Sequence, residues 1–305
     1  MSFGTIWHNV RELYWNAMRA PMRQPEDPNC PAKAMAYIAN LEDEVADDFD
    51  KAKFWTMLGG YHQRWSQLIG SFDILGVEQG FKLDLINPAT KRLSRTFSLE
   101  GKLDGVVRER DTGKLWVVEE KTAKGDLQPD SPYWRRLEVD PQCSTYYAAV
   151  QRIYNEVPAG IMYFVNVKPQ IRPLKATPIE NRKFTAKGFL HATQREEDET
   201  PEGFLMRLAE KIAEQPERYY QMVRVNRLKR DIYESETDIW DTAQNIQKAH
   251  NTNIWLRNPD SCISIIGQTC PFLPVCTHRA DIDDTGLYRK SLVPHEELVS
   301  EMSGD

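Results

Sequence analysis

The chain has 305 residues, an apolar share of 41% that includes eight tryptophans, and a formal net charge of −6. This composition excludes a disordered polypeptide and provides enough material for one large domain or two smaller ones. No stretch approaches the roughly 18 uninterrupted apolar residues that a membrane span requires. The N-terminus also lacks the basic and apolar regions of a signal peptide. We therefore expect a soluble cytoplasmic protein with no membrane partner.

Hydrophobic periodicity predicts helices over residues 5–70 and then short strands with a two-residue repeat between Leu75 and Val118. Turn-forming stretches at residues 87–91 and 110–114 separate these strands. The later elements are expected to be a helix after Asp140, a buried strand at residues 159–168, one or two long helices over residues 202–253, and a Cys- and Pro-rich loop region at residues 257–276. Strands flanked by helices predict an α/β fold with three layers.

This order of elements favours a single domain over residues 1–280. It would comprise a helical segment at residues 1–70, a core at residues 71–170, and a helical and cysteine-bearing segment at residues 200–280. We expect the acidic tail at residues 281–305 to be weakly ordered.

Two carboxylates stand where the interior of the sheet is expected. A tight hairpin around Asp111 and Thr112 would set residue pairs whose numbers sum to 223, and so place Asp104 opposite Glu119. Directly opposed side chains lie about 5 Å apart, so two such carboxylates repel each other. A divalent cation between them would remove that conflict. By strand alternation, Lys121 points to the same face as Glu119, and Glu120 points to the other face.

The pattern Leu103-Asp104, a hairpin and then Glu119-Glu120-Lys121 resembles the PD-(D/E)xK nuclease superfamily. Two further features are similar to its RecB-like branch. Gln142-x-x-x-Tyr146 matches a QxxxY motif on a helix, where the spacing puts both side chains on one face. His62 follows a glycine pair upstream of the strands, where that branch carries a metal-binding histidine. The resemblance implies a restriction-endonuclease-like core with a central mixed sheet flanked by helices.

Five cysteines without a signal peptide argue against a disulfide framework. Cys30 precedes the motifs, while Cys262, Cys270 and Cys276 follow them. This distribution resembles the iron–sulfur subgroup of RecB-like nucleases, in which four thiolates hold a [4Fe–4S] cluster that joins the N- and C-terminal segments. The seven residues between Cys262 and Cys270 depart from the shorter spacing of many relatives, and structural Zn²⁺ is the alternative. Cys143 is most simply a small buried hydrophobic residue.

The resemblance implies a metal-dependent deoxyribonuclease, more specifically an exonuclease acting in recombination, repair or phage DNA processing, with helicase, recombination or CRISPR-adaptation proteins as partners. His62, Asp104, Glu119 and the carbonyl of Glu120 would bind Mg²⁺ or Mn²⁺. Lys121 would position or deprotonate the attacking water, and Gln142 and Tyr146 would contact DNA. The basic runs at residues 168–188 and 224–230 would hold phosphates. The alternatives are an inactive DNA-binding protein or a structural partner subunit on the same fold.

Overall fold

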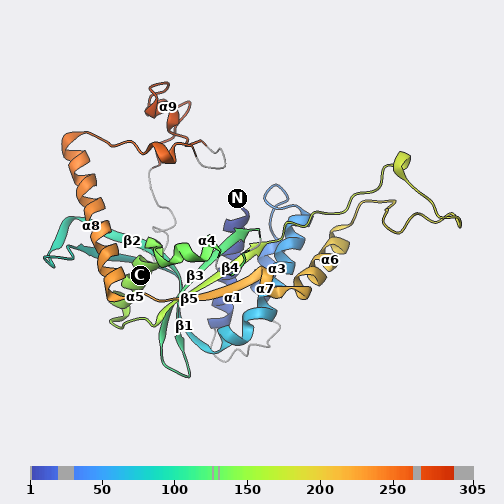
Figure 1. Cartoon of the computed structure of the whole chain (residues 1–305), viewed down its shortest axis with the longest axis horizontal. Helices are drawn as coiled ribbons and strands as arrows, with labels where there is room; N and C mark the ends of the chain where they lie inside the picture. The colour runs from blue at the N-terminus through green and yellow to red at the C-terminus, as the bar shows by residue number, and fades with distance from the viewer. Residues whose placement is uncertain (1, 20–30, 126, 130, 264–268, 292–305) are drawn as a thin grey trace. The chain divides into compact units, whose positions relative to one another are not determined.

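The structure is a computed structural model that describes the chain except for residues 1, 20–30, 126, 130, 264–268 and 292–305 (Figure 1). The chain divides into two compact units. The larger comprises Met1–Phe81 and Lys102–Ile232, and the smaller comprises Lys82–Gly101 and Tyr233–Asp305. The expected candidate site, apart from the cysteines, falls within the larger unit.

A five-stranded mixed sheet organises the larger unit. Its strands are β1 (Phe72–Ile86), β2 (Leu93–Glu109), β3 (Leu115–Lys124), β4 (Gly160–Lys168) and β5 (Tyr220–Val225), in the spatial order β1-β2-β3-β4-β5. Strands β2 and β3 are antiparallel, β3 and β4 are parallel, and β4 and β5 are antiparallel. The far ends of β1 and β2, at residues 82–101, belong to the smaller unit. The α/β class with a mixed sheet between helices is thus confirmed.

Helices α1 (Phe3–Arg19), α2 (Ala32–Ala39) and α3 (Asp48–Gly70) form a layer on one side of this sheet. Figure 1 shows α1 and α3 side by side there. Trp15 of α1 and Trp65 of α3 both pack edge-on against the ring of Phe164 in β4. Asp47 starts α3 by accepting a hydrogen bond from the backbone nitrogen of Asp50, which satisfies one of the free amides of the first turn.

Helix α5 (Pro141–Tyr154) connects the parallel strands β3 and β4. Parallel neighbouring strands require such a crossover, because the chain must return to the end of the sheet where the first strand began, and a tight turn is too short for that. Asp140 caps the helix by accepting hydrogen bonds from the backbone nitrogens of Gln142 and Cys143. Pro141 occupies the first turn, where its missing amide costs nothing. The short helix α4 (Pro132–Arg135) precedes α5.

The C-terminal half departs from the expected run of helices. Helices α6 (Pro201–Glu214) and α7 (Pro216–Tyr219) are followed by strand β5, and only then by the long helix α8 (Lys229–Thr252). Pro216 begins the short helix α7, and the segment Tyr220–Val225 that follows contains two valines and a tyrosine, which favour a strand. Because β5 pairs with the edge of β4, long-range pairing overrides the helical periodicity of its surroundings.

The smaller unit contains a short 3-10 helix at Pro259–Ser261 and, after it, the short helix α9 (Leu273–Cys276). In the larger unit, short 3-10 turns lie at residues 136–138 and 179–181. No helix in the described part of the chain is long and apolar enough to cross a membrane.

Candidate active site

The register of β2 and β3 brings the two carboxylates together as the sequence predicts. Gly105 pairs with Val118 and Arg108 with Leu115, so paired residue numbers sum to 223. Asp104 and Glu119 hold the next positions. The Asp104 carboxylate accepts a hydrogen bond of 2.8 Å from the backbone nitrogen of Glu120. Asp104 is therefore tied to the strand that carries Glu119.

Glu119 is almost completely buried, with an exposed fraction of 1%. Burial raises its pKa from 4.5 to about 8, and repulsion from the Asp104 carboxylate adds to the effect. Lys121 opposes the shift by forming an ion pair with Oε1 of Glu119. The other oxygen, Oε2, has no hydrogen-bond donor in the described part of the chain. A further cation beside Glu119 would offset the remaining cost of burying its charge.

Lys121 lies on the same face as Glu119, as strand alternation predicts. Its side chain is 36% exposed, so the ammonium can reach both the carboxylate and solvent. Burial acts to lower the pKa of Lys121, but the charge of Glu119 outweighs it and the net effect is a raised pKa. The ammonium therefore stays charged at neutral pH.

Helix α5 covers this face of the sheet with the predicted Gln-x-x-x-Tyr pair. The amide Nε2 of Gln142 donates a hydrogen bond of 3.0 Å to the hydroxyl of Tyr146. Burial raises the pKa of Tyr146, and the charges of Glu119 and Asp104 act in the same direction. Tyr146 thus lies within electrostatic range of both carboxylates. Cys143 is buried between these positions, as expected for a small hydrophobic residue, and burial raises its pKa to about 12.

Glu120 points to the opposite face and has a different role from its neighbour. Its carboxylate accepts hydrogen bonds from the indole of Trp15 at 3.0 Å, the hydroxyl of Tyr61 at 2.5 Å and the amide of Asn166 at 3.1 Å. The Arg11 guanidinium lies 3.6 Å away. Burial raises the pKa of Glu120, and Arg11 opposes that shift. Glu120 is thus a fully bonded structural carboxylate, while its backbone carbonyl remains the predicted ligand.

Arg11, on α1, is a central residue that the sequence interpretation missed. It is fully buried and contacts the Asp104 backbone oxygen at 3.4 Å, the Asp104 carboxylate at 4.0 Å and Glu78. Burial acts to lower the pKa of Arg11, but the charges of these carboxylates and of Glu120 outweigh it, so the net effect is a raised pKa. Arg11 therefore fixes Asp104 from the side of the sheet that faces α1. The only signal in the sequence was a charged residue on the apolar face of an N-terminal helix.

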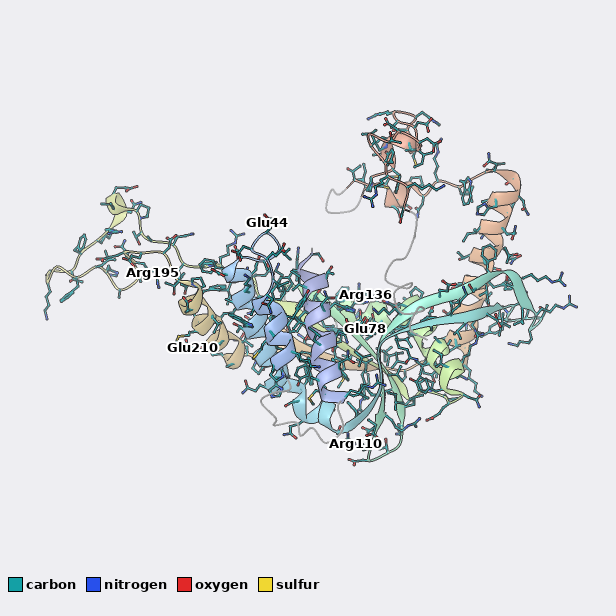
Figure 2. All side chains as sticks on the ribbon, turned by 180° about the vertical axis from the view of Figure 1, so that it is seen from behind. Glu44, Glu78, Arg110, Arg136, Arg195 and Glu210 are labelled. Atoms are coloured by element: carbon teal, nitrogen blue, oxygen red, sulfur yellow. The ribbon has the colours of Figure 1, made fainter. Side chains whose placement is uncertain are left out.

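His8, Glu78 and Asp104 form a second group of ligating side chains, whose atoms lie within 4.8 Å of one another. Figure 2 labels Glu78, which lies in β1 with a positive φ of 51°. His8 Nε2 is 2.6 Å from Glu78, and Lys102 Nζ is 3.4 Å from it. Burial acts to raise the pKa of Glu78, but His8, Arg11 and Lys102 lower it. Three basic side chains therefore already surround the Glu78 carboxylate.

His62 does not join the carboxylates in this structure. Its Nδ1 lies 2.9 Å from the hydroxyl of Tyr14, in the layer formed by α1 and α3, and burial lowers its pKa. The histidine found near Asp104 is His8. A metal-binding role for His62 remains a prediction, and its Nε2 is the ring nitrogen that the Tyr14 contact leaves for it.

The cysteine site is described only in part. Cys30 lies outside the described residues. In the smaller unit, the backbone nitrogen of Cys270 donates to the oxygen of Cys262 at 2.9 Å, and Cys276 ends α9. Among the described side chains, no group of three ligating atoms includes a cysteine. A cluster on Cys30, Cys262, Cys270 and Cys276, whether of iron and sulfur or of zinc, thus remains a prediction.

The residues on the α5 face fit a hard divalent cation. Asp104, Glu119 and the Glu120 carbonyl would supply oxygen ligands, which Mg²⁺ and Mn²⁺ prefer. The orphaned Oε2 of Glu119 and the raised pKa of that group are physical signs of a missing positive charge. Comparison with known proteins adds no relative, because no family model and no curated protein matches the chain.

Proposed function

We propose that the protein is a divalent-metal-dependent deoxyribonuclease, with its active site on the face of β3 covered by α5. The observation that carries the proposal is the closeness of the Asp104 carboxylate to the buried Glu119, which is ion-paired with Lys121. The resemblance to PD-(D/E)xK nucleases supplies the reaction class. The order β2, β3, α5, β4 agrees with the core which that resemblance implies.

In this role Asp104, Glu119 and the Glu120 carbonyl would hold Mg²⁺ or Mn²⁺, which would supply a water of lowered pKa and stabilise negative charge on the scissile phosphate. Lys121 orients that water and offsets phosphate charge through its ammonium. Gln142 and Tyr146 contact the DNA strand from the covering helix. Arg11 keeps Asp104 in register from the opposite side of the sheet.

Three features favour a working enzyme over an inactive binding protein. The acidic pair is present, the lysine shares its face, and Oε2 of Glu119 has no hydrogen-bond donor among the described residues, whereas Glu120 has three. A carboxylate with only a structural role would be stabilised by such donors. The arrangement on the α5 face is costly for the fold unless a ligand repays it.

The test is digestion of end-labelled single-stranded and duplex DNA by purified protein in Mn²⁺ or Mg²⁺, with EDTA as the blank. Wild-type protein and the control Asp111→Asn, which changes an exposed residue of the β2–β3 turn, should cleave equally. Glu119→Gln and Asp104→Asn should not cleave. Cleavage by Glu119→Gln at the wild-type rate would show that the active site is misassigned. Binding of DNA and metal by the wild type without cleavage would favour the inactive DNA-binding alternative.

A further inference from the structure

An arm at residues 171–199 leaves the sheet after β4 and returns at the start of α6. At 29 residues it is far longer than most loops in compact domains, and such loops commonly carry function. Figure 1 shows its two legs running together, and Figure 2 labels Arg195 on the returning leg. None of the proposed catalytic residues lies in this arm.

The base of the arm is built on one buried carboxylate. Glu199 accepts two hydrogen bonds of 2.7 Å from the Arg207 guanidinium and one of 2.9 Å from the backbone nitrogen of Leu174. Asp198 pairs with Lys175 at 2.8 Å and accepts from the nitrogen of Ala176. Asp198 and Glu199 thus hold the two legs together at the base.

Hydrogen bonds continue along the legs towards the end of the arm. Arg182 donates to the carbonyl oxygens of Thr177 and Glu196 at 3.0 and 2.8 Å. Gln194 joins the opposite leg through the nitrogen of Lys183 and the oxygen of Asn181. The arm is therefore a defined hairpin-like structure.

The tip, residues 181–191, differs from the base in its charge, because all its charged side chains are basic. It contains Arg182, Lys183 and Lys187 but no acidic residue. Phe184 and Phe189 are 60% and 69% exposed, and a turn with Gly188 at φ 80° separates them. The turn is closed by a 2.8 Å hydrogen bond from the nitrogen of Thr185 to the oxygen of Phe189. Two exposed aromatic rings thus lie beside two lysines that have no ion-pair partner among the described residues.

We propose that this tip binds single-stranded DNA, with Phe184 and Phe189 stacking on unpaired bases and Lys183 and Lys187 contacting the flanking phosphates. Aromatic rings stack on any base but cannot reach bases inside a duplex, and lysines neutralise the backbone without reading sequence. This combination selects single strands over duplexes. The proposal rests on the proposed nuclease function for its choice of DNA as the polymer, and it specifies the form of that substrate.

The test separates binding from cleavage. The full-length Glu119→Gln protein is titrated in EDTA against a fluorescent oligo(dT) strand and against a duplex of equal length, at several salt concentrations. The oligo(dT) strand should bind more tightly. Adding Phe184→Ala and Phe189→Ala should weaken its binding at least about tenfold at every salt concentration and leave duplex binding unchanged. Both rings are exposed, so the melting temperature should not change.

Two matched variants distinguish stacking from the other contributions. Phe184→Leu with Phe189→Leu keeps apolar side chains but removes the π-faces, so it should bind as weakly as the alanine pair. Lys183→Gln with Lys187→Gln should instead reduce the slope of log affinity against log salt by about 1.4, since each single-strand phosphate contact contributes about 0.7.

The proposal is overturned if the alanine pair binds oligo(dT) like its parent, if the leucine pair retains affinity, or if duplex binding falls in parallel. Loss of binding to anionic phospholipid vesicles in the alanine pair, with DNA binding intact, would identify a membrane-binding tip instead. None of these binding measurements requires hydrolysis. A protein that binds oligo(dT) through the tip but never cleaves DNA would therefore refute the proposed function and leave this inference standing.

Discussion

Replacing Glu119 with glutamine should stabilise the metal-free protein at alkaline pH while destroying the metal site. In the folded protein the pKa of this carboxyl rises from 4.5 to about 8, because it is buried next to Asp104. A carboxyl with a raised folded pKa favours the fold only while it is protonated. Its contribution is complete below pH 4.5, declines as pH rises from there, and is lost above about pH 8.

The magnitude follows from the same values. The pKa changes by 8 − 4.5 = 3.5, and each pKa unit corresponds to about 1.4 kcal/mol. Ionising Glu119 inside the fold therefore costs on the order of 5 kcal/mol above pH 8. Glutamine avoids this cost. We expect a melting temperature about 5–10 °C above wild type at pH 8.5 in EDTA, and no difference near pH 4.5.

Adding Mn²⁺ should reduce the stability difference between the two proteins at pH 8.5 by about half. Wild-type protein gains about 2.7 kcal/mol when free metal is a hundredfold above its dissociation constant, whereas the variant has lost a ligand and gains little. Binding at neutral pH should also release a proton from Glu119, so the apparent affinity of wild type rises with pH up to about 8. Scanning fluorimetry across pH, with and without metal, measures both effects.

The neighbouring Glu120→Gln is the matched control, because the same chemical change is made one residue away. Glu120 accepts three hydrogen bonds, and an amide NH2 in place of one oxygen leaves a buried donor unpaired, so the variant should be destabilised by about 1–3 kcal/mol without metal. If Glu119→Gln also melts below wild type at pH 8.5 in EDTA, Glu119 is not a strained carboxylate and the reasoning fails.

Lys121→Ala should lose most of the cleavage rate but retain metal affinity in calorimetric titration, because its ammonium cannot ligate a cation. Equal loss of both would contradict that division of roles. Gln142→Ala and Tyr146→Phe should weaken cleavage less, chiefly by raising KM for DNA, so a change confined to kcat would argue against DNA contact. Cys30→Ala should lower both bound iron or zinc and the melting temperature, because a cluster closing so long a loop stabilises the whole fold, whereas Cys143→Ala should lower neither. Unchanged metal content and melting temperature in Cys30→Ala would eliminate the four-cysteine site.

The sequence by itself determined the features of the site that depend on local geometry. The β2–β3 turn sets the register of its hairpin, and strand alternation sets the face of each side chain. Asp104, Glu119 and Lys121 could therefore be brought together from residue numbers alone. Likewise, the four-residue spacing of a helix turn joins Gln142 to Tyr146.

Only the tertiary structure decided the features that depend on contacts between distant segments. Arg11 and His8 meet Glu78 and Asp104 across some 70–95 positions of sequence, and no local pattern encodes that meeting. The contact between His62 and Tyr14, 48 positions apart, likewise comes only from the tertiary structure. Strand β5 forms because the edge of β4 is available to pair, although its sequence surroundings favour helix. The surroundings of the two adjacent glutamates also differ, because the two faces of one strand meet different helices. Glu120 accepts bonds from Trp15 and Tyr61, whereas Glu119 has only the Lys121 ammonium among the described side chains.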